Sequence, residues 1–340
     1  MPFTAQEIAN VANAALDFYI KSQPVSSTIQ DKPLLNALLK NKKTFPGGKE
    51  FISAAVKGDY TSQLEGYEHK DQVSFANPAN MKRVNFPWRE LNLGIEVTHT
   101  ELKKDGISVV EGGGTSEHSQ AEKTRLAGIF KDKLEDMQEG YERSLDAMLH
   151  KDGTQDAKEI PGAASIVRTA PTTGTVGGLD SGALTWWRNL VDLNITSNTT
   201  TMALIKKMET FERQLRRYGG RPTLRLAGSD FIDAYLDEQR ANGRFTDNGW
   251  MGKKADAGMG DAAFKGHDIM YDPMMDDLGE AKFLRLYDTR HMCLYFMEGE
   301  EKKKHMPERP HDQYVLYRAL TSTGGMVADQ LNCHGIMSIN

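Results

Sequence analysis

The most regular hydrophobic pattern in the chain lies between residues 116 and 149. Apolar side chains recur there at steps of three and four residues, and the positions between them are mostly charged or polar, which predicts one amphipathic helix. The stripe consists of Leu126, Phe130, Leu134, Met137, Tyr141, Leu145 and Met148. Such a helix is about 50 Å long, which is more than a compact domain of this size can enclose.

The 75 residues before this helix, from 41 to 115, show the opposite pattern, because few of them can bury themselves. Weak apolar alternation at 51–56 and 72–75, with turn signals nearby, predicts a two-stranded ribbon over the polar extension 41–85. A ribbon of two strands is only marginally stable in water. A long helix together with a long polar extension indicates a subunit that completes its burial against other chains.

Shorter patterns predict the remaining elements. Thr4 and Glu7 form a capping box that opens a helix over 4–21, and Pro33 opens a short helix that ends at Leu39. Further helices are expected over 202–218 and 230–240, and strands over 91–97, 223–227, 268–271, 283–287, 293–296, 313–320 and 325–329. Loops are expected over 169–181, 247–260 and 300–311, with a glycine hinge at 112–114. Strands scattered between helices indicate an α+β fold.

Composition adds limits to this picture. The 340 residues are enough for two domains, and 39% hydrophobic with 26% charged residues is typical of globular proteins. No apolar run approaches the roughly 18 residues of a membrane span, and the first residues lack a signal-peptide pattern. Cys293 and Cys333 are expected to be reduced core residues. The net charge of −5 argues against a dedicated nucleic-acid binder, but it is compatible with a shell whose inner face alone is basic.

Motifs for catalysis or metal binding are weak. Residues 249–254 resemble a phosphate-binding loop in composition only. His305 and His311 lack a third ligand at a sensible spacing, so solvated loop histidines are favoured over a metal site. The carboxylates of Asp272, Asp276, Asp277 and Glu280 are interpreted as an acidic surface turn, and the lysines at 302–304 as a solvated loop tip. We therefore expect no catalytic residue, no metal site, no cofactor and no enzymatic activity.

Trp186 and Trp187 are adjacent in a region expected to be a loop, and Arg188 follows them. Each indole ring buries roughly 200 Å², so leaving both exposed is costly. The pair is either a local core anchor or an anchor at a subunit contact, where Trp and Arg are favoured.

The order of these segments resembles the major capsid (coat) proteins of tailed bacteriophages, which have the Hong Kong-type capsid fold, over nearly the whole chain. The most specific part is 177–189, which is similar to the family's Gly-Gly-apolar-Asp…Trp-Arg-Asn stretch. Other residues that carry the resemblance are Pro33-Leu34-Leu35, Gly47-Gly48-Lys49, Phe86-Pro87-Trp88, Gly228-Ser229 and Tyr271-Asp272-Pro273.

The resemblance implies a subunit that assembles as pentamers and hexamers into an icosahedral head enclosing double-stranded DNA. It implies an N-arm over 1–44, an E-loop hairpin over 45–85, a peripheral domain over 86–155 and 321–340 with its spine helix near 116–151, and an axial domain over 156–320. The subunit-contact candidates that follow are Gly47, Gly48, Lys49, Phe51, Phe75, Trp88, Trp186, Trp187 and Arg188.

The implied partners are further copies of the chain, a portal protein and, as a further candidate, a decoration protein, in a virion assembled in the host cytoplasm. Packaged DNA would be touched without sequence specificity, and no membrane partner is expected. Because the N-arm starts almost at Met1, we predict a separately encoded scaffolding protein. Lys49, Lys57 and Lys70 lie where some family members form a covalent crosslink, but no motif singles one out, so we predict none. The alternative is a bacterial nanocompartment (encapsulin-like) shell protein of the same fold.

Overall fold

The structure, a computed structural model, describes residues 3–4, 30–58, 64–72, 75, 80–104, 109–110, 120–241, 262–305 and 315–340. Residues 5–21 of the first expected helix, the glycine hinge and the loop expected over 247–260 lie outside the described residues. The contacts divide the chain into two compact units. Unit 1 comprises 1–30, 90–145 and 298–323, and unit 2 comprises 31–89, 146–297 and 324–340.

Unit 1 contains most of the long helix α4, which runs over Gln120–His150 and confirms the predicted amphipathic helix. The predicted stripe is buried at Leu134, Met137, Tyr141 and Leu145. Two strands, β5 and β16, pair with the first part of the long strand β17. The elements besides α4 are β1 (Phe3–Thr4), β5 (Arg89–Thr98), α3 (His99–Lys104), β6 (Val109–Val110), β16 (Lys303–His305) and the first part of β17 (Val315–Ala328).

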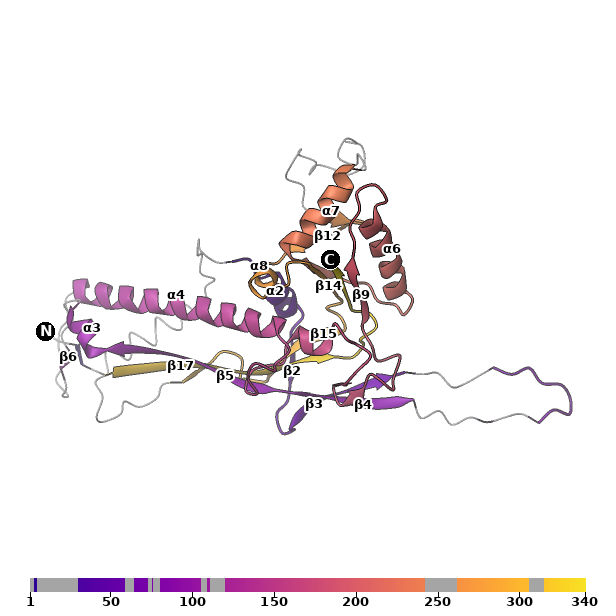
Figure 1. Cartoon of the computed structure of the whole chain (residues 1–340). Helices are drawn as coiled ribbons and strands as arrows, with labels where there is room; N and C mark the ends of the chain where they lie inside the picture. The colour runs from indigo at the N-terminus through magenta and orange to yellow at the C-terminus, as the bar shows by residue number, and fades with distance from the viewer. Residues whose placement is uncertain are drawn as a thin grey trace. The chain divides into compact units, whose positions relative to one another are not determined.

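Unit 2 is built around a five-stranded sheet in the order β13-β10-β14-β18-β9 (Figure 1). The two outer pairs, β13 with β10 and β9 with β18, are parallel, whereas β14 is antiparallel to both of its neighbours. The strands are β9 (Leu190–Ile195), β10 (Leu224–Ala227), β13 (Met270–Tyr271), β14 (Phe283–Tyr287) and β18 (Gly335–Ile339).

A second group of strands in unit 2 joins β15 to β2 in parallel and to the last part of β17 in antiparallel register. The remaining elements of the unit are α2 (Pro33–Lys40), β2 (Lys43–Phe45), β3 (Phe51–Lys57), β4 (Met81–Pro87), α5 (Ala163–Ile166), β7 (Thr175–Val176), β8 (Leu179–Asp180), α6 (Ala203–Arg216), α7 (Ser229–Ala241), β11 (Ala263–Phe264), β12 (His267–Asp268), α8 (Pro273–Asp277) and β15 (Met292–Met297). Residues 31–44, which were expected in the N-arm, thus supply α2 and β2 to this unit.

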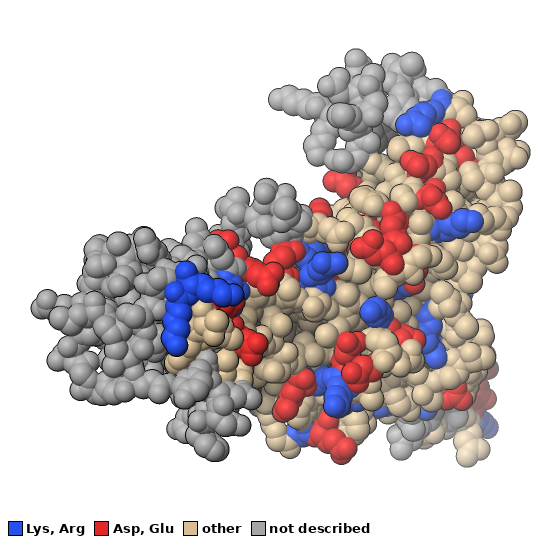
Figure 2. Space-filling model, turned by 60° about the vertical axis from the view of Figure 1, so that its left-hand side comes forward, with Lys and Arg blue, Asp and Glu red and all other residues tan. Residues whose placement is uncertain are grey.

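The surface of the described residues carries both signs of charge. Acidic and basic side chains are interspersed over the face shown in Figure 2, in line with the near balance of 42 Lys and Arg against 47 Asp and Glu in the sequence. No described helix combines the length and the apolar character that a membrane crossing requires.

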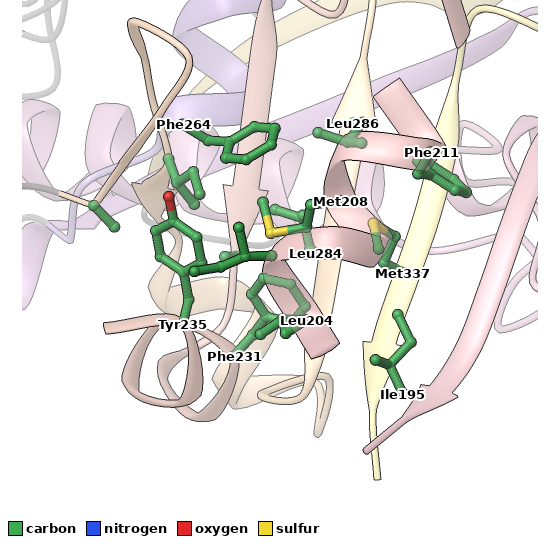
Figure 3. Close-up of a cluster of buried hydrophobic side chains, with 14 of the residues drawn as sticks. Ile195, Leu204, Met208, Phe211, Phe231, Tyr235, Phe264, Leu284, Leu286 and Met337 are labelled. Atoms are coloured by element: carbon green, nitrogen blue, oxygen red, sulfur yellow. The ribbon is translucent and has the colours of Figure 1, made fainter. Parts of the chain in front are cut away.

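The core of unit 2 lies where α6 and α7 cover the sheet (Figure 3). Phe231, Leu284 and Met337 are each 0% exposed, and they come from α7, β14 and β18. A carboxylate caps the start of α6 from the neighbouring helix: Glu238 of α7 accepts hydrogen bonds from the backbone N–H groups of Leu204 and Ile205, both at 3.1 Å. The first N–H groups of a helix have no partner within it, so this side chain satisfies donors that would otherwise be buried unpaired.

Several sequence expectations need correction. The strands expected over 313–320 and 325–329 are one strand, β17, and β16 forms inside the expected charged loop. The strands β9 and β18 were not expected, and the second strand of the ribbon is β4 at 81–87, after the segment 72–75 that was expected to form it. Cys293 and Cys333 are buried free thiols, which confirms that prediction.

Candidate subunit-contact surface

The ribbon expected in the polar extension is the antiparallel hairpin of β3 and β4, which pairs seven residues on each strand from Phe51 opposite Pro87 to Lys57 opposite Met81 (Figure 1). Its two faces differ. Ile52, Val84 and Phe86 on one face are buried, whereas the other face is largely exposed. The hairpin stem therefore already has a partner for its apolar face.

That partner is the rest of unit 2, and two glycines allow the close approach. A Cβ on Gly177 would lie 3.0 Å from Val84 and Phe86, and one on Gly325 would lie 2.6 Å from the Pro87 carbonyl oxygen. Gly177 also accepts a hydrogen bond from the Asn85 N–H at 2.9 Å. Side chains larger than hydrogen at these two positions would push the stem away from its support.

Trp186 holds the far end of the stem. A Cβ on Gly58, the residue after β3, would lie 2.2 Å from the indole ring of Trp186, so the ring lies directly against this glycine. The Trp186 side chain is half-buried. The ring thus supports the end of the stem where β3 stops.

Trp187 and Arg188 are used inside their own chain. Trp187 is 1% exposed, and its Nε1–H donates to the Val176 carbonyl oxygen at 3.0 Å. Arg188 donates to the carbonyl oxygens of Ser181 (2.5 Å) and Gly182 (2.6 Å). Of the two roles open for the tryptophan pair, the local core anchor describes Trp187.

The same loop is closed by further hydrogen bonds. Asn189 Nδ2 donates to the Arg168 carbonyl oxygen at 2.8 Å, and Arg168 donates to Ser181 Oγ at 2.6 Å. Burial lowers the pKa of Arg168, but these contacts keep its guanidinium in a fixed place. The stretch 177–189, which carries most of the family resemblance, therefore forms a fixed platform under the hairpin stem.

The base of the hairpin contains Gly47, Gly48 and Lys49. Gly48 has a φ of +93°, a backbone conformation that favours glycine. The Lys49 carbonyl oxygen accepts a hydrogen bond from Trp88 Nε1 at 2.9 Å, which ties the two ends of the hairpin together. Trp88 is half-buried, while the Lys49 side chain is exposed.

The far part of the hairpin contrasts with its stem. All nine residues from 64 to 72 are exposed, and Phe75 is 94% exposed. Of the eight large apolar side chains that are exposed among the described residues, five belong to this hairpin: Phe51, Leu64, Tyr67, Phe75 and Met81. We call Leu64, Tyr67 and Phe75 the tip residues. Exposed apolar groups concentrated in one segment mark a surface that another molecule covers.

The acidic surface turn expected at 272–280 needs correction at one residue. Asp277 is exposed and Asp276 and Glu280 are half-buried, but Asp272 does not lie on the surface. Asp272 is 0% exposed and accepts a hydrogen bond from the Met274 N–H. Asp276 accepts from the Ser229 N–H and the Tyr271 hydroxyl, and Glu280 pairs with Arg285. His305 lies in β16 and contacts Thr321, and His311 lies outside the described residues.

Comparisons by sequence find no match, either to a family model or to a curated protein. Comparison by structure finds matches to solved structures. The chain is similar to the cyanophage A-1(L) capsid asymmetric unit, with a TM-score of 0.65 and 12% identity over 93% of this chain and 94% of the other.

Two further solved structures agree. A chain of the capsid of an empty GTA particle has a TM-score of 0.57 and 10% identity, covering 93% of this chain and 99% of its own. A chain of the capsid of Myoviridae phage XM1 has a TM-score of 0.51 and 9% identity, covering 95% of this chain and 96% of its own. The chain therefore has an α+β fold of the Hong Kong capsid type from end to end, as its segment order predicted.

Proposed function

We propose that this chain is a major capsid protein, which assembles as pentamers and hexamers into an icosahedral phage-type head enclosing double-stranded DNA. The observation that carries the proposal is a fold likeness that spans more than nine-tenths of this chain and of capsid chains alike. A virion component of this kind has a structural role, and we expect no enzymatic activity from it.

The hairpin supplies the physical support for assembly. The stem packs against its own unit, whereas the tip residues are exposed. Covering Leu64, Tyr67 and Phe75 on a neighbouring copy would contribute roughly 1.5–3 kcal/mol for each large apolar side chain. Each subunit in a shell makes several different contacts at once, so modest single contacts add up to a stable particle.

We assign the parts by this function. Residues 45–85 are the E-loop, unit 1 with α4 corresponds to the peripheral domain, and the five-stranded sheet of unit 2 with α6 and α7 corresponds to the axial domain. The strand β18 belongs to that sheet, so we place 335–339 in the axial domain and not with the long helix.

The proposal keeps the expected partners. These are a separately encoded scaffolding protein, a portal protein, a decoration protein and packaged DNA bound without sequence specificity. The exposed contact candidates on this view are the tip residues with Phe51 and Lys49, while Gly47, Gly48, Trp88 and Trp186 hold the hairpin in place.

Electron microscopy of negatively stained preparations tests the proposal directly. The chain is expressed alone and together with the products of its neighbouring genes. We expect uniform closed shells only in the second preparation, with subunits that run as single bands after boiling in detergent because no crosslink forms. Uniform shells from the chain alone, filled with a copurifying protein, would support the nanocompartment alternative. Monomers under every condition would contradict both shell functions.

A further inference from the structure

Three buried polar side chains meet in unit 2 where the end of α4 approaches α8. Asp146 and His150 are four residues apart in α4 and therefore share one face of the helix. Asp272 precedes α8, and the three side chains are 1%, 0% and 0% exposed. One ligand atom from each lies within 4.8 Å of the other two. Figure 1 shows α2, α8 and the end of α4 close together around this point.

The hydrogen bonds of this cluster are incomplete in a specific way. Asp272 Oδ1 accepts from the Met274 N–H at 3.1 Å, and Asp146 accepts a backbone hydrogen bond from Leu35. The atoms left over are Asp146 Oδ1, Asp272 Oδ2 and both ring nitrogens of His150, none of which has a hydrogen-bond partner. Buried polar atoms without partners are rare and costly.

The close approach of His150 to Asp272 is not a hydrogen bond. His150 Nε2 lies 3.1 Å from Asp272 Oδ2 and 4.0 Å from Asp146 Oδ2, yet neither contact has hydrogen-bond geometry. The imidazole nitrogen and the carboxylate oxygens lie close together without a hydrogen bond between them, which is the arrangement expected of ligands that share one metal ion. The backbone N–H groups from Leu35 and Met274 would then orient the two carboxylates from outside.

The charges of the cluster do not balance when the imidazole is neutral. Lys32 is the positive charge that acts on Asp146. Lys32 is 5% exposed and offsets one of the two carboxylates. One negative charge is left in a site closed to water, where an uncompensated charge is expensive.

We propose that Asp146, His150 and Asp272 form a structural site for a divalent transition-metal ion, with Zn²⁺ as the best match to one imidazole nitrogen and two carboxylate oxygens. The ion would join the last turn of α4 to α8 and, through the Leu35 backbone, to α2. The sequence expectation of no metal site missed this cluster, because two of its ligands are 122 residues apart in the chain.

Metal analysis of the full-length chain tests the site. The purified protein is stripped with a chelator, reloaded with Zn²⁺ and freed of excess ion, and its zinc content is measured by mass spectrometry. We expect about one equivalent per chain, and a melting temperature that rises by several degrees with Zn²⁺ and falls back with chelator. The variants H150Q and D272N should lose the equivalent.

The matched control is H291Q, which removes another His–Asp pair, because His291 Nδ1 lies 2.8 Å from Asp329 on the surface. This variant should keep the bound zinc. If H150Q fails to fold, the visible absorption of the Co²⁺-loaded wild-type chain reports tetrahedral coordination without any mutation. The proposal would be overturned if wild-type protein held no more zinc than the ligand variants, with an unchanged melting temperature and no Co²⁺ band. The cluster would then be an ion network balanced by Lys32.

Discussion

The sheet core and the hairpin tip of unit 2 differ sharply in the exposure of their apolar side chains. In the core, Phe231, Leu284 and Met337 are completely buried by α6, α7 and the strands (Figure 3). At the tip, Leu64 and Phe75 are 104% and 94% exposed. The core is buried by residues of its own chain, whereas exposed apolar groups concentrated at the tip indicate a surface that another copy covers.

The stem between these two regions explains how the contrast is maintained. Its apolar face packs on the platform at 177–189 and on Gly325, and its base is closed by the hydrogen bond from Trp88 to Lys49. The chain therefore combines a stem supported by its own unit with exposed apolar side chains beyond it. Mutations in the core should change folding, and mutations at the tip should change assembly.

The largest expected effect is in the core. Phe231→Ala removes a fully buried ring from α7 and should lower the free energy of unfolding by about 3–5 kcal/mol, as measured by chemical denaturation. Leu64→Ala is the matched control at the tip and should change it by less than about 0.5 kcal/mol. Similar losses in both variants would remove the contrast between the two regions.

The next effect concerns the cap between α7 and α6. Glu238 is 0% exposed and accepts four hydrogen bonds, from Ser197 Oγ and from the N–H groups of Asn198, Leu204 and Ile205. Glu238→Ala leaves these donors unpaired and should cost about 2–4 kcal/mol of stability in the same assay. Glu238→Gln keeps acceptor oxygen and should lose less. Equal stability of the three proteins would show that the cap contributes nothing.

A pH dependence should also come from the buried part of unit 2. Burial lowers the pKa of His334 from 6.5 to about 4. The folded state therefore binds the proton more weakly than the unfolded state, so stability is complete above pH 6.5 and falls as the pH drops toward 4, by up to about 3 kcal/mol. The variant H334N should flatten this part of the pH–stability curve. An unchanged slope would assign the acid sensitivity to other groups.

A smaller effect on stability is expected where the stem meets Trp186. Gly58→Ala places a methyl group in the space of the indole ring and should cost about 1–3 kcal/mol, since one side must move. Gly66→Ala is the control, because no atom lies within 4 Å of a Cβ there. We expect fewer closed particles from Gly58→Ala than from Gly66→Ala, counted by electron microscopy. Equal counts would show that the contact between the stem and Trp186 does not affect assembly.

The smallest effect on folding, with a large effect on assembly, is expected at the tip. The double variant L64S/F75S should unfold like wild type within about 0.5 kcal/mol, because both side chains are almost fully exposed. The fraction of protein that sediments as capsomers or shells should drop severely. Q72A, at an exposed polar position of the same segment, is the control. Normal assembly of the double variant would mean that the tip is not a contact.

Elements with a complete pattern were predictable from the sequence. The periodic stripe identified α4, and α6 lies within the helix expected over 202–218. The strand β17 was split in two because Thr321 to Gly325 lacks apolar residues. Its polar groups are satisfied by tertiary contacts, such as the Tyr141 hydroxyl on Ser322 Oγ, and Gly324 is needed because a Cβ would lie 2.7 Å from the Tyr295 carbonyl oxygen.

The candidate surface was predictable in part. The sequence indicated a ribbon in the polar extension, but β4 has weak alternation, and its burial depends on Gly177 and Gly325 far away in the chain. The neighbours of Trp187 in sequence did not show whether its ring is a local core anchor or an anchor at a subunit contact. Asp272 was expected on the surface, because no residue near it in sequence indicates that His150 lies 3.1 Å from it in the fold.

Amide hydrogen exchange tests most directly whether the tip is completed by neighbouring copies. Exchange is followed in isolated subunits and in assembled particles, for peptides covering 64–72 and, as a reference, the buried strand at 224–227. We predict fast exchange at 64–72 in free subunits and at least tenfold slower exchange in particles, with the reference slow in both. Equal rates at 64–72 in the two states would contradict the account.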